Sequence, residues 1–213
     1  MAKPNRGGRL GKASGLNPSD IVGTRSLVSE RGHNQELVDD TLAVFSYVRD
    51  EYGAIVEDIE LVTLKGRGKS VLAYYDGSNI AVNESYFSKQ MEKAYQECVE
   101  QGFHPSSGNK TGLQAVVAHE LGHMLTDEIG AKIGKTGIGS INEVATIVVK
   151  EARKETKHRG VVQMAKAISG YATYSNAEAI AEAFADVYCN GKKAHSESKA
   201  IVNVMNKYLK GVN

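Results

Sequence analysis

The chain has 213 residues, of which 41% are hydrophobic and 24% are charged, as in ordinary soluble globular proteins. Its formal net charge is +1, so the composition gives no reason to expect nucleic acid or another polyanion as a partner. No segment approaches the roughly 18 apolar residues of a membrane-spanning helix, and no apolar stretch follows the basic N-terminus as in a secretory signal peptide. Cys98 and Cys189 lie far apart, which fits a reducing compartment. We therefore expect a cytoplasmic protein without a membrane partner.

The beginning of the chain predicts a flexible basic arm. Residues 1–33 are rich in glycine, serine, asparagine and arginine, a composition that buries too little apolar surface to fold by itself. Its lysines and arginines could contact phosphates, but a solvated tail is the favoured interpretation. The remainder, residues 34–213, is long enough for one folded domain with a sizeable core.

The first half of the predicted domain combines helices with short strands. In chain order, the apolar periodicity and the β-branched runs predict a helix at Gln35–Glu51, strands at Ile59–Leu64, Val71–Tyr75 and Ile80–Asn83, and a helix at Ser88–Gln101. Asp76-Gly77 is a hairpin signal between the last two strands.

The second half of the domain is predicted to be helical. The expected helices lie at Thr111–Glu128, from a capping-box pattern at Ser140–Glu143 onward, and at Val161–Ile168, Ala177–Cys189 and Ser198–Leu209. Together the two halves predict an α+β domain, in which a short mixed or antiparallel sheet packs on the helix that begins near Thr111.

The most informative segment is His119-Glu120-Leu121-Gly122-His123. On an α-helix, residues four apart lie nearly one above the other, so both histidines can bind one tetrahedral zinc ion. Glu120 lies about 100° further round the helix, where it can reach a water on the metal and take its proton. A purely structural zinc site has no use for this glutamate.

Two histidines leave the metal without a third protein ligand. A third histidine six residues after His123 would indicate a metzincin, but Ile129 stands there. Asp127 lies one turn after His123 and would have to bend back against its own helix, so we interpret it as solvated or supporting.

A better third ligand comes from Glu178 and Glu182, which lie four apart on an alanine-rich helix. Two carboxylates on one face of such a helix are costly to bury without a partner. A zinc ion would be that partner for Glu178, while Glu182 would accept the remaining ring N–H of a ligating histidine. In the alternative interpretation, Glu178 interacts with Ser175 at the helix N-terminus and Glu182 is exposed.

The segment His119–His123, together with Tyr171 and the downstream segment Asn176–Phe184, resembles the gluzincin metallopeptidases. It is most similar to the branch that includes the catalytic domain of anthrax lethal factor and the Pro-Pro endopeptidases, and to HExxH-bearing proteins encoded by phages and prophages. The resemblance covers two blocks, about Leu113–Thr126 and Ser169–Tyr188. It implies a small gluzincin-type metallopeptidase domain at residues 34–213.

By that resemblance, one Zn²⁺ ion would be held by His119, His123 and Glu178. Glu120 would be the general base and acid. Glu182 matches the carboxylate that supports a ligating histidine from one turn after the ligand glutamate.

The resemblance also implies residues that handle the substrate. The family's tyrosine, which donates a hydrogen bond to the developing oxyanion, falls on Tyr171 by motif spacing, and Tyr174 is the alternative. Family members hold an extended peptide on an edge strand above the active-site helix. The strand Ile80, Ala81, Val82 and Asn83 fits that description and would bind the substrate by β-augmentation.

The expected function is therefore a zinc-dependent endopeptidase that acts on a peptide or protein substrate. Two other interpretations stay open: a zinc-stabilised structural or interaction module without proteolysis, for example a virion component, and a toxin-like effector protease with a single protein target.

The remaining histidines, which are His33, His104, His158 and His195, are expected on the surface or in loops.

Overall fold

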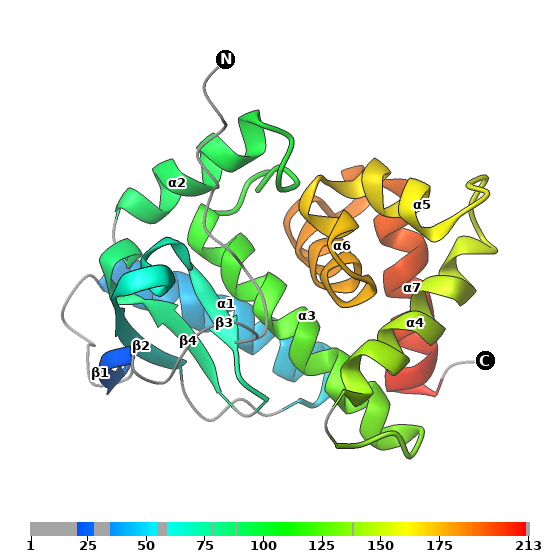
Figure 1. The fold of residues 1–213 in the computed structure, drawn as a ribbon, viewed down its shortest axis with the longest axis horizontal. Coiled ribbons are helices and arrows are strands. Elements are labelled where there is room, and N and C mark those ends of the chain that lie inside the picture. Colours follow the sequence, from blue (N-terminus) through cyan, green and yellow to red (C-terminus); the bar gives the residue numbers. More distant parts are fainter. Residues whose placement is uncertain are drawn as a thin grey trace.

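Helix α3 (Gly112–Lys132) lies between a mixed β-sheet and a helical half of the molecule (Figure 1). The computed structural model describes residues 21–27, 35–54, 59–77, 79–87, 89–137 and 139–211. Within these ranges the chain has an α+β fold, as the sequence predicts.

The described sheet has four strands in the order β1-β2-β4-β3. Their bounds are Ile21–Ser26 for β1, Ile59–Leu64 for β2, Ala73–Tyr75 for β3 and Ile80–Asn83 for β4. β1 is antiparallel to β2, β2 is parallel to β4, and β3 is antiparallel to β4. The predicted bounds of β2 and β4 are confirmed. β3 is shorter than predicted, because Gly66–Ser70 form a 3-10 helix, η3, and Val71 makes only an isolated bridge.

Two expectations about the sheet are wrong. Ile21–Ser26 falls within the predicted flexible arm, yet it pairs with β2; the rest of the arm, residues 1–20 and 28–33, lies outside the described residues. Ile80–Asn83 is an interior strand rather than an edge, because β2 and β3 bind it on its two sides. The edge of the described sheet on that side is β3.

The predicted helices all form. Apart from α3, their bounds are Gln35–Tyr52 (α1), Lys89–Glu100 (α2), Ser140–Arg153 (α4), Val161–Ile168 (α5), Asn176–Asn190 (α6) and Ser196–Lys210 (α7). Four of them (α1, α3, α6 and α7) are one to three residues longer than expected. The capping box expected at Ser140 does not form. Gly139, with a φ of 84°, precedes α4 instead, and the Ser140 hydroxyl donates to the carbonyl of Gly137.

α3 is buried on all sides because both halves of the molecule pack against it. α1, β3 and β4 contact it from the sheet half, and α4, α6 and α7 contact it from the helical half. Val116, Val117, Leu121 and Leu125 expose no surface, and burying such side chains stabilises the fold by about 1.5–3 kcal/mol each. The helix that carries the histidine motif is thus the centre of the hydrophobic core.

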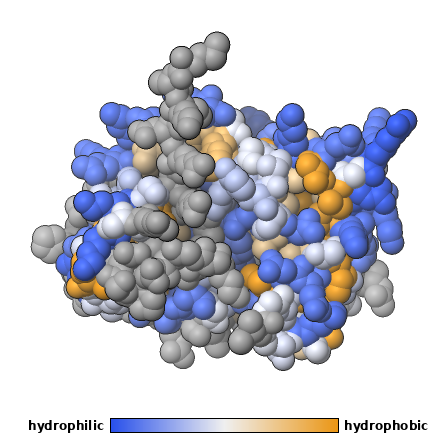
Figure 2. All heavy atoms as spheres, in the orientation of Figure 1, coloured by the Kyte–Doolittle hydropathy of each residue, from blue (hydrophilic) through white to orange (hydrophobic). Residues whose placement is uncertain are grey.

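None of the helices in the described ranges is long and apolar enough to cross a bilayer. Among the residues coloured in Figure 2, hydrophilic ones predominate and hydrophobic ones form separate patches.

Candidate metal centre

The two histidines of the motif lie deep inside the molecule on α3. The helix begins with a capping box in which the Thr111 hydroxyl accepts from the Gln114 N–H and the Gln114 side chain accepts from the Thr111 N–H. This fixes the start of the helix two turns before His119. His119 and His123 then project from successive turns toward α6 and are 0% and 1% exposed.

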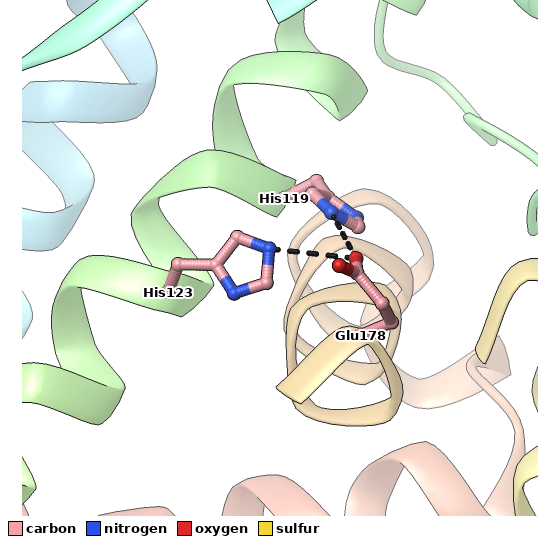
Figure 3. A group of neighbouring side chains, drawn as sticks. All are labelled: His119, His123 and Glu178. Atoms are coloured by element: carbon pink, nitrogen blue, oxygen red, sulfur yellow. Dashed lines mark hydrogen bonds and ion pairs between the residues drawn. The ribbon is translucent and has the colours of Figure 1, made fainter. Parts of the chain in front are cut away.

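α6 brings a carboxylate to the same place. Ser175 caps this helix, and its hydroxyl accepts from the Glu178 N–H at 3.1 Å. The capping interaction expected in the alternative interpretation therefore exists, but it involves the Glu178 backbone. The Glu178 side chain points at the two imidazoles instead (Figure 3).

A glycine allows α6 to approach α3 closely enough for this contact. An ideal Cβ on Gly122 would lie 2.8 Å from the Cα of Ala181 and 3.3 Å from the Cβ of Phe184. Carbon atoms in ordinary contact are about 3.5–4.0 Å apart. Gly122 thus has a packing role one residue before the second histidine.

The three side chains fit a single divalent cation. Their ligand atoms all lie within 4.8 Å of one another. Glu178 Oε2 is 3.1 Å from His119 Nε2 and 3.4 Å from His123 Nε2. Ligand atoms at about 2.1 Å from a tetrahedral zinc ion are about 3.4 Å apart. Both nitrogens of His123 are buried and have no close hydrogen bond within the described residues, and Nε2 has Glu178 as its ion-pair partner, so this nitrogen is the one that could bind a metal.

The charges of the site also suit a cation. Burial by itself lowers the pKa of His119, but hydrogen bonds to Glu178 and Glu182 outweigh it and raise the pKa to about 10. Burial raises the pKa of Glu178, but the neighbouring His123 and His119 bring it down to about 2. Glu178 and Glu182 therefore stabilise a positive charge on His119, which lies between them. A metal ion can replace the proton on the His119 nitrogen that faces Glu178.

Glu182, one turn after Glu178, supports His119 from behind. The Nδ1–H of His119 donates to Glu182 Oε1 at 2.8 Å, which leaves the opposite nitrogen, Nε2, directed at Glu178. The expected contact between Glu182 and a motif histidine is therefore present. Glu182 is 1% exposed, so the alternative interpretation of an exposed residue is wrong.

Two partners of Glu182 were not expected from the sequence. His104 Nδ1 lies 3.0 and 3.1 Å from the two Glu182 oxygens, and the Ser169 hydroxyl donates to Oε2 at 2.7 Å. His104 lies in a loop, as expected, but it is only 3% exposed, so it is not on the surface. In the sequence, the only sign of a buried position was that His104 lies between Phe103 and Pro105, in the loop that leads into α3. His158 and His195 are partly exposed as expected, and His33 lies outside the described residues.

The two candidate tyrosines occupy different environments. Tyr171, in the 3-10 helix η5 (Tyr171–Thr173), is buried, and its ring centroid is 5.7 Å from that of His119. Tyr174 is 67% exposed. Tyr174 also lines a pocket of about 310 Å³ beside the metal ligands, together with His123, Ile141, Asn142, Ser175, Ala177 and Glu178.

The other predicted site residues divide into those near the ligands and those away from them. Glu120 is fully buried, and its charge contributes to the raised pKa of His119. Ile80–Asn83 is not brought to the ligands as a free edge, because β2 and β3 bind it on its two sides. Asp127 interacts with the Tyr75 hydroxyl on β3 and is not part of the ligand group.

Comparison with known proteins identifies no relative of this chain. No protein-family model, no curated protein and no solved structure matches this chain.

Proposed function

We propose that this protein is a zinc-dependent endopeptidase of the gluzincin type. The observation that carries the proposal is the convergence of His119, His123 and Glu178 on one point at ligand spacing. Glu120 lies between the two histidines in sequence, and Glu182 supports His119. Histidine and carboxylate ligands in this combination favour zinc, and the glutamate between the histidines favours hydrolysis over a purely structural site.

The residues around the ligands have complementary roles in this proposal. A zinc ion, when bound, polarises a carbonyl group and lowers the pKa of water. Glu120 accepts the proton of the attacking water and returns it to the amine that leaves. Glu182 holds the Nδ1–H of His119, so that Nε2 faces the metal position.

A tyrosine hydroxyl would donate to the oxyanion that forms on the scissile carbonyl. Tyr171 has the family's spacing to Glu178 and packs against His119. Tyr174 lines the pocket beside His123 and Glu178. Replacement of each by phenylalanine separates the two assignments, because only the donor's removal lowers kcat without changing zinc content.

The proposed substrate is an extended peptide, and its docking strand differs from the one expected. β4 has no open side, whereas β3 is the edge of the described sheet and contacts α3. An extended segment that pairs with β3 by β-augmentation would run beside the helix that carries His119. The role proposed for Ile80–Asn83 therefore passes to Ala73–Tyr75.

Metal content and peptide cleavage test the proposal together. The purified chain should contain about one zinc per molecule and should cut members of a peptide library read by mass spectrometry. Glu120→Gln should keep the zinc and lose cleavage. Glu128→Gln, at an exposed position of the same helix, is the matched control and should retain both. Zinc binding without cleavage of any peptide or lysate protein would favour a zinc-stabilised structural module instead.

A further inference from the structure

The loop between α2 and α3 contributes a buried histidine to the carboxylate that supports the metal ligand. His104 comes from a segment without regular structure, 78 residues before Glu182 in sequence. Its Nδ1 is within 3.1 Å of both Glu182 oxygens. A carboxylate only accepts hydrogen bonds, so both His104 and His119 must carry a proton on Nδ1.

We propose that His104 is a positioning residue for the metal centre, which fixes the Glu182 carboxylate and through it the ring of His119. The inference rests on the proposed metal site. Glu182 has rotatable bonds between its backbone and its carboxylate. His104 binds both oxygens, Ser169 binds Oε2 and His119 binds Oε1, so the carboxylate has one orientation.

The loop itself is held in place by hydrogen bonds from two neighbouring segments. Its backbone at Gly102 and Phe103 accepts hydrogen bonds from the N–H groups of Gly170 and Tyr171. The Tyr95 hydroxyl donates to the carbonyl of Pro105. The connection to Tyr171 means that the loop also positions the segment with the candidate oxyanion donor.

The His104 ring is equally constrained. It stacks on Tyr95 with an interplanar angle of 8°, and its centroid is 5.3 Å from that of Tyr171. Its second nitrogen, Nε2, is buried and has no hydrogen-bond partner in the described part of the chain. A buried polar atom without a partner costs stability, so phenylalanine would serve a pure packing role better. The hydrogen bond from Nδ1 is therefore the function of this side chain.

Two substitutions separate the hydrogen bond from the packing. His104→Phe keeps an aromatic ring against Tyr95 but removes the donor. His104→Asn loses the ring but places an amide N–H near the position of Nδ1. Zinc affinity is measured by competition with a chromophoric chelator, and the visible absorption of the Co²⁺-loaded protein reports the ligand geometry.

We expect His104→Phe to weaken zinc binding by about 10–100-fold and to shift the Co²⁺ bands, while His104→Asn stays close to the wild type. In a Glu182→Gln background, His104→Phe should cause no further loss, because the histidine acts through that carboxylate. The inference is overturned if the phenylalanine variant binds zinc normally, or if the two losses add.

A measurement on the wild-type chain keeps the test independent of how the variants fold. The ¹⁵N NMR signals of the histidine rings should show His104 protonated on Nδ1. A ring protonated only on Nε2 would refute the role of His104, whatever the metal content. A wild-type protein that binds no zinc would refute the proposed function, whereas a zinc-binding protein whose His104 is protonated only on Nε2 would refute this inference alone.

Discussion

Replacing Gly122 with alanine should weaken zinc binding and have only a limited effect on the stability of the metal-free fold. The added methyl group would lie 2.8 Å from the Cα of Ala181, against about 3.5–4.0 Å in ordinary carbon contacts. α3 and α6 must then separate by about 0.7–1.2 Å at this point. Because metal ligands tolerate displacements of only about 0.2 Å, Glu178 would move out of reach of at least one histidine.

The effect on stability is limited because two contributions oppose each other. Alanine is favoured over glycine inside a helix by about 1 kcal/mol, and overpacking of a core costs about 1–3 kcal/mol. The metal-free variant should therefore be about 0–2 kcal/mol less stable than the wild type. Zinc affinity should fall by at least about tenfold.

Urea unfolding of the metal-free protein and zinc competition titrations measure the two effects separately. Gly160→Ala is the matched control, because a Cβ at Gly160 meets no atom within 4 Å, and it should change neither quantity substantially. Zinc affinity at the wild-type level in Gly122→Ala would show that the close approach of α6 does not set the ligand geometry.

Three further predictions concern the ligands and a distant ion pair. Glu178→Gln should lower zinc affinity by more than about 100-fold, as measured by titration; wild-type affinity would remove Glu178 from the ligand set. Chelation should lower the unfolding temperature of the zinc-loaded chain, since a ligand at 1,000 times its Kd stabilises by about 4 kcal/mol; an unchanged melting curve would contradict a metal between α3 and α6. Burial raises the pKa of Glu197, but hydrogen bonds, the first of them from His158, outweigh burial and lower the pKa overall. The resulting stability is present above the unfolded pKa of about 4.3 and is lost as the pH falls through the folded pKa. Glu197→Gln should therefore destabilise the fold more at pH 7 than at pH 3 in urea unfolding, and an equal loss at both pH values would refute this.

The parts of the fold that depend on local pattern could be predicted from the sequence. β2, β4 and α5 have the expected bounds because alternation and helical periodicity are properties of short segments. The ligand group could be predicted because a two-histidine motif lacks a ligand, and Glu178 lies on a helix where a carboxylate needs a partner.

The parts of the fold that depend on contacts between segments far apart in the sequence could not be predicted. β4 is interior because β2 joins it in parallel while β3 folds onto its other side, and no residue of β4 specifies its neighbours. Ile21–Ser26 contains glycine, threonine, arginine and serine, which resemble a loop until β2 is present. His104 lies in a loop without periodicity, and its environment comes from residues 67 and 78 positions downstream in Tyr171 and Glu182.

The ligands of the metal centre come from helices that are far apart in sequence, since His119 and Glu178 are separated by 59 residues. An ion held by both would act as a cross-link between the two halves of the domain. A covalent cross-link that closes a loop of this length reduces the entropy of the unfolded chain by an amount worth about 4 kcal/mol. With the ion in place, α6 cannot leave α3 without breaking a coordinate bond. The same centre that we propose for hydrolysis would thus stabilise the domain against unfolding and against proteolysis.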